Sequence, residues 1–156
     1  MTDILSSLIP VLRLKLGDTN PLTYRYLDAW LVTSLEASLS LLARYWGSKY
    51  LLTSTGVVYR NTAYIDFTEV SPPIIQFKDE WIIILAASII VKSGTLENLS
   101  WSISSWRDSE LQFSNLQSGK EKSTSLDRDI DELSKFLRSP IRRPVAAVRN
   151  SWTDQF

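Results

Sequence analysis

The chain has 156 residues, enough for one domain, and its 44% hydrophobic and 22% charged residues are ordinary values for a globular protein. Lys and Arg number 17, as do Asp and Glu, which argues against a protein dedicated to sequence-specific nucleic-acid binding. His and Cys are both absent, which excludes His-based catalysis, thiol nucleophiles, disulfides and thiolate or imidazole metal sites. We therefore expect a non-enzyme with no catalytic residue, no metal and no cofactor.

Carboxylates are the remaining candidates for chemistry, through Asp79 and Glu80 or through the three aspartates of 127–131. The three aspartates alternate along a predicted helix, so they do not share one face. We interpret them as a solvated surface balanced by Arg128 and Lys135.

Two helices are predicted in the first third of the chain. Apolar residues at helical spacing predict the first over 4–16, where Pro10 should kink or split it, and 17–21 (Gly-Asp-Thr-Asn-Pro) should stop it. The second should run from about residue 27 to Gly47, which suits a helix end. Its predicted apolar stripe is Leu27, Leu31, Leu35, Leu39, Leu42 and Trp46.

A β-hairpin is predicted at about 51–72, where the apolar period becomes alternating. Residues 57–60 and 63–70 are β-prone, and an Asn-Thr turn should join them. A lone hairpin is marginally stable in water. Ile65 and Phe67, which alternate with polar residues, should therefore face the helical core or a neighbouring subunit.

Residues 79–94 predict the buried central helix of a small bundle, with two acidic residues at its start and Gly94 at its end. Its apolar run, 81–91, is far shorter than the roughly 20 residues that span a bilayer, so we expect no membrane insertion.

A loop over 95–105 should lead to a last helix over about 109–137. Residues 112–125 lack an apolar stripe and contain Gly119, so this part is either an exposed arm or a helix that faces polar neighbours in a ring. The final turns do carry a stripe of Leu126, Ile130, Leu133 and Leu137.

The predicted fold class is thus mainly α: a bundle of about four helices over 1–138 with one inserted hairpin, and an extended C-terminal tail over 139–156. Pro140 and Pro144 forbid a continuous helix in the tail, which we expect to be disordered until bound. Trp and Arg often anchor interfaces, so the tail is either a partner-binding element or an inert extension. The predicted binding residues are Arg138, Arg142, Arg143, Val145, Val148, Arg149, Trp152 and Phe156.

The segment VLRLKLGDTNPLTYRYLDAWLVTSLEASLSLLARYW, residues 11–46, resembles the opening of head–tail adaptor (connector) proteins of tailed bacteriophages. In those proteins a short first helix reaches a Gly-Asp or similar turn, and an aromatic-Asp motif starts the second helix. Tyr26-Leu27-Asp28 and Trp30-Leu31 stand at these positions. Residues 86–133 are similar to the central and final helices of adaptors from long-tailed phages, and the match covers most of 8–137.

The resemblance implies a structural virion protein of the neck, assembled in the host cytoplasm. It would form a ring, commonly twelve-fold, beneath the portal protein and above a head-closure or tail protein. DNA would pass through the ring without sequence-specific binding, and residues 138–156 would reach into the portal.

Two alternatives remain open. Another neck component, such as a head-closure or tail-terminator protein, would be β-rich or α/β, which the helical periodicity disfavours. A helical nucleic-acid-binding regulatory module would need a basic face, yet residues 1–105 carry eight Lys and Arg against nine Asp and Glu.

Overall fold

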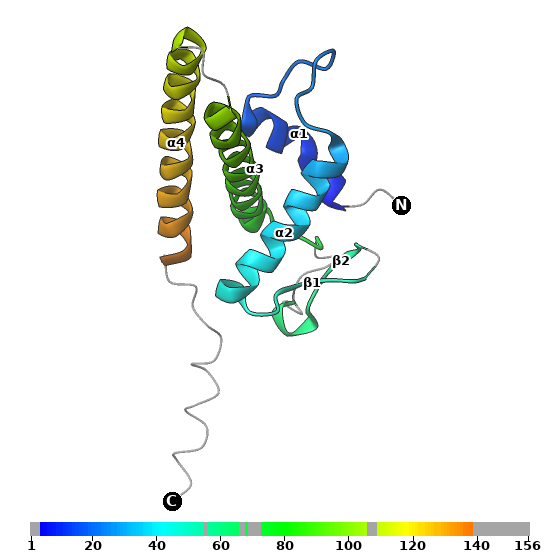
Figure 1. The fold of residues 1–156 in the computed structure, drawn as a ribbon. Helices are drawn as coiled ribbons and strands as arrows, with labels where there is room; N and C mark the ends of the chain where they lie inside the picture. Colours follow the sequence, from blue (N-terminus) through cyan, green and yellow to red (C-terminus); the bar gives the residue numbers. More distant parts are fainter. Residues whose placement is uncertain (1–3, 55, 66–67, 69–72, 106–108, 139–156) are drawn as a thin grey trace, which may run out of the picture.

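The computed structural model describes residues 4–54, 56–65, 68, 73–105 and 109–138, with the backbone alone described for 96–105, 109–119 and 138. The described chain is mainly α-helical with one two-stranded hairpin, which confirms the predicted fold class (Figure 1). The elements in order are α1 (Ile4–Leu16), α2 (Asp28–Trp46), β1 (Tyr50–Leu52), β2 (Val58–Arg60), a 3₁₀ turn (Thr62–Tyr64), α3 (Phe77–Ser105) and α4 (Ser109–Arg138).

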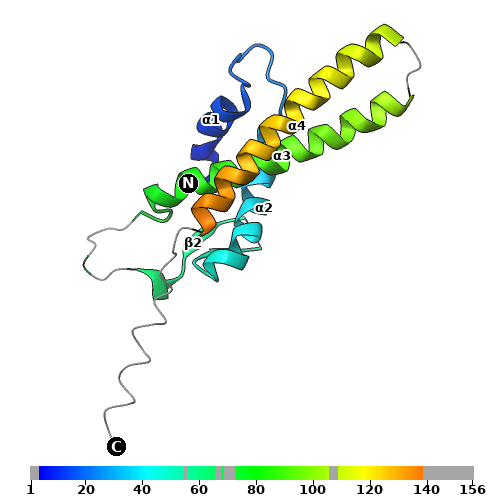
Figure 2. The ribbon, with the colours of Figure 1, turned by 90° about the vertical axis from the view of Figure 1, so that its left-hand side faces the viewer.

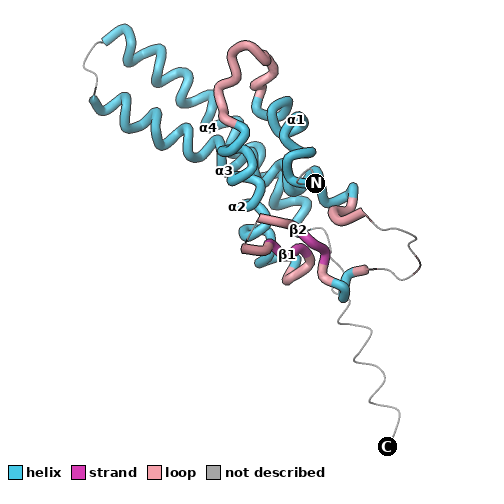
Figure 3. The backbone as a smooth tube through the Cα atoms, turned by 90° about the vertical axis from the view of Figure 1, so that its right-hand side faces the viewer, coloured by secondary structure: helices cyan, strands magenta, loops and turns pink. Residues whose placement is uncertain are grey.

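Helix α3 is the centre of the bundle. It packs against α1 and α2 on one side and against α4 on the other. α3 and α4 form a long antiparallel pair that extends well beyond α1 and α2 (Figure 2, Figure 3). No helix in the described ranges is long and apolar enough to cross a membrane.

The hydrophobic core joins all four helices and the hairpin. Residues 83–88 of α3 are buried, as predicted for a central helix. Leu5, Leu8 and Leu12 of α1 are buried against them, while Leu133 is the one α4 side chain among the described buried apolar residues. The predicted α2 stripe is also buried except at its first member, since Leu27 precedes the helix and is 63% exposed.

The sequence predicts that Pro10 kinks or splits α1, and the split does not occur, because the helix continues through Pro10. A proline inside a helix removes one backbone hydrogen bond and costs about 3 kcal/mol. Buried leucines on both sides of Pro10 offset that cost, because each removes apolar area from water. The predicted stop is confirmed, because α1 ends at Leu16 and Gly17 has a φ of 71°.

The hairpin exists, but the predicted pairing of its strands is wrong. β1 pairs antiparallel with β2 in the register Tyr50–Arg60, Leu51–Tyr59 and Leu52–Val58. The turn between them depends on Gly56, whose φ of 80° favours glycine, and on a Thr53 hydroxyl that accepts the Val57 N–H at 3.0 Å.

The predicted Asn-Thr turn is instead the start of the 3₁₀ turn. The Asn61 side chain accepts the Ala63 N–H at 3.1 Å and caps it. The described part of the predicted second strand, 63–65 and 68, therefore contains no strand.

Helix α3 also differs from its prediction, since it continues past Gly94 to Ser105 and replaces the expected loop over 95–105. A glycine inside a helix costs about 1 kcal/mol, which is not enough to end a helix that is packed along its length. Lys92, two residues before Gly94, donates to Ser125 of α4 at 2.9 Å, so α3 is still paired with α4 at this point. The last helix is confirmed over 109–138, across Gly119.

Candidate functional site

A buried arginine holds the connection between α1 and α2. Arg13 is 6% exposed and donates to Asp18, to Asp28 at 2.6 Å and to the Tyr26 carbonyl at 2.8 Å. Its guanidinium carbon lies 3.7 Å from the centre of the Tyr24 ring. Burial acts to lower the pKa of the guanidinium, but the two carboxylates outweigh it and raise that pKa, so the group stays charged.

The loop itself, residues 17–27, is closed by further hydrogen bonds. The buried Asp18 accepts the Arg25 N–H at 2.9 Å, and the Asn20 side chain accepts the Leu22 N–H at 3.1 Å. An Asx turn of this kind stabilises one local conformation of the backbone. The loop is therefore held in one conformation by α1 and by the first turn of α2.

This loop and the first turn of α2 present large apolar side chains to solvent. Leu22 is 92% exposed, Leu27 63%, Trp30 62% and Tyr24 47%. We call these four residues the apolar corner. Single exposed apolar residues are common on protein surfaces, but several of them on one short, preorganised segment are typical of a protein-interaction site.

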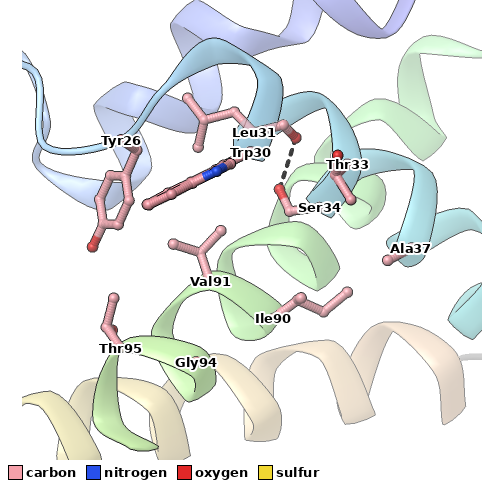
Figure 4. A pocket seen from close by; sticks show the side chains of 10 residues that line it. All are labelled: Tyr26, Trp30, Leu31, Thr33, Ser34, Ala37, Ile90, Val91, Gly94 and Thr95. Carbon is pink, nitrogen blue, oxygen red and sulfur yellow. Dashed lines mark hydrogen bonds between the residues drawn. The ribbon is translucent and has the colours of Figure 1, made fainter. Parts of the chain in front are cut away.

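A groove adjoins the apolar corner between α2 and α3 (Figure 4). It has a volume of about 360 Å³ and a mainly apolar lining. Tyr26 and Trp30 lie on one side of its opening and Val91 and Thr95 on the other, with Ala37 towards its far end.

The groove becomes basic towards α4. A second hollow of about 440 Å³ shares Tyr26, Trp30 and Thr95 with the first. Its lining adds Arg25 from the loop and Lys122 from α4, and both side chains are exposed. The whole groove thus combines an apolar floor with a cationic end.

The interpretation of the three aspartates of 127–131 as a solvated surface is wrong for Asp129, which is fully buried. Its carboxylate accepts from Lys92 and lies 3.2 Å from the Lys15 ammonium, so it joins α1, α3 and α4. Burial alone would raise the pKa of Asp129, but the two lysines outweigh it and lower that pKa. Helical periodicity could not show this, because both lysines come from other helices.

Asp79 lies at the start of α3, as predicted, but it also anchors the hairpin. Its carboxylate accepts from Lys49 and from the Tyr50 hydroxyl at 2.6 Å, and it is buried. Burial and the bond to this carboxylate raise the pKa of Tyr50 well above its usual value. The buried carboxylates of Asp79 and Asp129, like that of Asp18, are therefore occupied by structural partners.

No family model, curated protein or solved structure matches the chain. Within the described ranges, no group of three or more Asp, Glu, His or Cys side chains could hold a metal ion.

The predicted site residues fall mostly outside the described part of the chain. Phe67 and the tail from Ser139 lie outside the described residues, as does the side chain of Arg138, the last residue of α4. Ile65 is half-buried and lies outside the two strands.

The sequence did not predict the apolar corner or the groove. One signal was available: Trp30 lies at the start of α2 but off its apolar stripe, where a polar residue would be expected.

Proposed function

We propose that this protein is a head–tail adaptor of a tailed bacteriophage, a structural protein of the virion neck. It would form a ring under the portal protein, with a head-closure or tail protein below it, and DNA would pass through the ring. The proposal rests on the resemblance of residues 11–46 and 86–133 to such adaptors.

The observation that best supports an assembly role is the apolar corner. The segment that resembles the adaptor opening contains both the Arg13 contacts and the exposed Leu22, Leu27 and Trp30. Holding this loop in one conformation lowers the entropic cost of docking a partner on it.

The tail is the proposed portal-binding element. We expect Arg142 and Arg143 to meet acidic groups of the portal and Trp152 to enter an apolar pocket there. Val145, Val148, Arg149 and Phe156 would complete this contact, and Arg138 would join it to α4.

Electron microscopy of the protein mixed with a candidate portal, and with DNA-filled heads, tests the proposal. We expect a ring under the portal and attachment to the heads. Deletion of 139–156 should abolish attachment and leave the melting temperature nearly unchanged, because a segment with two prolines and few apolar residues cannot make a core of its own.

Two outcomes would contradict these statements. Full occupancy of heads by the truncated chain would place the portal contact on the helices. Absence of any binding by the full chain to portals or heads would reject the adaptor function.

A further inference from the structure

The groove between α2 and α3 and the basic hollow beside it are continuous, because both are lined by Tyr26, Trp30 and Thr95. Their volumes are about 360 and 440 Å³. Each lies within the range of small-molecule sites in proteins, about 300–1,000 Å³. The two halves differ in chemistry, and this difference indicates a class of ligand.

The apolar half has few hydrogen-bond donors left for a polar ligand. Its lining includes the hydroxyls of Thr33, Ser34 and Thr95 (Figure 4). Each hydroxyl donates to a carbonyl three or four residues earlier in its own helix, at 2.7–2.9 Å. Most other lining side chains are apolar, such as Ile90 and Val91. A polar group placed here would lose its hydrogen bonds to water and regain few, so this half suits a hydrocarbon chain or an aromatic ring.

The other half carries positive charge that is not compensated. Arg25 and Lys122 are exposed, and neither side chain belongs to an ion pair of the described chain. Lys92, the third cation of this lining, is held by Asp129. No carboxylate lines this hollow among the described residues. An anionic group bound here gains charge-assisted hydrogen bonds from Arg25 and Lys122.

We propose that the whole groove binds an anionic amphiphile, a small molecule with a hydrocarbon or aromatic body and a carboxylate or phosphate head. The body lies between α2 and α3, and the head lies beside Arg25 and Lys122. A free anion would bury no apolar surface, and an uncharged hydrocarbon would gain nothing from the cations. The inference does not depend on the adaptor function, because the proposed portal contact is made by the tail.

The charge of the groove disfavours the chain's own tail as the occupant. Residues 139–156 carry Arg142, Arg143 and Arg149 against the single acidic side chain of Asp154. The basic end of the groove repels such a segment.

Isothermal titration calorimetry of the full chain tests the proposal, with each probe below its critical micelle concentration. Dodecanoate and dodecyl phosphate are the anionic probes, and dodecyltrimethylammonium is a cationic control with the same hydrocarbon chain. We expect saturable binding of at least one anionic probe and about ten-fold weaker binding of the cationic control. Acetate and inorganic phosphate, which lack the apolar body, should not bind measurably.

Gly94→Leu tests the apolar half. Gly94 lines this hollow, and a Cβ built there meets no atom within 4 Å, so α3 can accept a side chain that occupies the groove. Affinity for the tighter anionic probe should fall about ten-fold, because the apolar body loses its place. Gly94→Ala is the matched control and should keep most of the affinity. Both variants replace a glycine inside a helix, so neither should lower the melting temperature.

Arg25→Gln combined with Lys122→Gln tests the basic half. The pair should lower the affinity for the anionic probe several-fold and leave that for dodecyltrimethylammonium little changed. The control combines Arg44→Gln with Arg128→Gln, two exposed cations that line neither hollow.

No binding of either anionic probe, equal affinities for anionic and cationic probes, or affinity unchanged by Gly94→Leu overturns the proposal. Higher affinity after deletion of 139–156 would assign the groove to the tail and reject the amphiphile. Affinity that falls as the protein concentration rises would assign the groove to a second copy. Portal attachment is measured separately, so none of these results decides the adaptor function.

Discussion

At the scale of one residue, Asp129 shows how the bundle holds α4, a helix with few buried apolar side chains in its described part. It is fully buried and contacts two lysines, Lys15 and Lys92, from two other helices. A buried charge is tolerated only when its partners are close, and removal of one partner leaves the others uncompensated. The carboxylate therefore determines where α4 lies on α1 and α3.

Asp129→Asn should lower the free energy of unfolding by about 3 kcal/mol, since it leaves two poorly exposed ammonium groups without their anion. Urea unfolding measures the change. The matched control is Asp127→Asn on the exposed face of α4, which should change stability by less than about 0.5 kcal/mol. Equal effects of the two substitutions would contradict the buried ion pairs.

The same carboxylate makes the free energy of unfolding depend on pH in the acidic range. Its pKa is lowered in the folded chain, so its contribution is complete above the ordinary Asp value of about 3.9 and is lost as the pH falls towards the folded pKa. Below about pH 4 the wild-type free energy of unfolding should fall more steeply than that of Asp129→Asn. Parallel curves would show that Asp129 does not titrate in this way.

In the hairpin, Tyr50 has a structural role like that of Asp129 in α4, because its hydroxyl donates to the buried Asp79. Tyr50→Phe removes the hydroxyl that donates to Asp79 and accepts the Gln76 N–H at 3.1 Å. We expect a loss of about 1–2 kcal/mol, the range of a buried hydrogen bond to a charged group. Tyr59→Phe, at an exposed position of β2, is the control and should be nearly silent in thermal unfolding.

The pKa of Tyr50 is raised, so its contribution is complete below the ordinary Tyr value of about 10 and is lost above it. Above about pH 10 the wild type should therefore lose more stability than Tyr50→Phe.

At the scale of elements, three glycines that the sequence predicts at helix ends differ in the structure. Gly17 and Gly47 follow the ends of α1 and α2 with positive φ, as the sequence predicted. Gly94 carries the same local signal but lies inside α3. The local signal is identical in kind, and packing against α4 decides between a helix end and a helix interior.

Two glycine substitutions test this difference. Gly94→Ala should raise the free energy of unfolding by about 0.5–1 kcal/mol, because alanine favours helix and a Cβ there meets no atom within 4 Å. Gly56→Ala should lower it by about 1–2 kcal/mol, because φ is 80° and a Cβ would lie 3.0 Å from Glu36. Thermal unfolding of both variants gives the signs, and destabilisation by Gly94→Ala would instead support a helix end at Gly94.

The hairpin shows a second limit of local patterns. The sequence predicts a hairpin at about 51–72 with strands at 57–60 and 63–70, and it does not predict a strand at 50–52. Tyr50 enters the sheet because its ring packs at 5.6 Å from Trp46 and its hydroxyl reaches Asp79, 29 residues away. Such a distant contact leaves no period in the sequence.

At the scale of the whole molecule, the described core lies in α1, α2, α3 and the hairpin, and α4 adds little apolar surface to it. Among the described residues, the large apolar side chains that are exposed are distributed over α1, α2, the hairpin, α3 and α4. Stable obligate interfaces bury extensive apolar area.

The isolated chain should therefore be helical and either monomeric or weakly associated, and it should form its ring on a partner. Light scattering over a concentration series measures this, and its control is the same series with a candidate portal. A tight dodecamer at nanomolar concentration would contradict it.

The sequence by itself determined the helical class, the α2 stripe from Leu31 to Trp46, the buried segment of α3 and the last helix, because each depends on a period that runs along one element. Tertiary structure alone decided the burial of Asp129, the strand pairing, the course of α3 through Gly94, and the groove under Trp30. The physical reason is common to all four. Their free energies come from contacts between residues that are distant in the chain, and such contacts outweigh local preferences of about 1 kcal/mol.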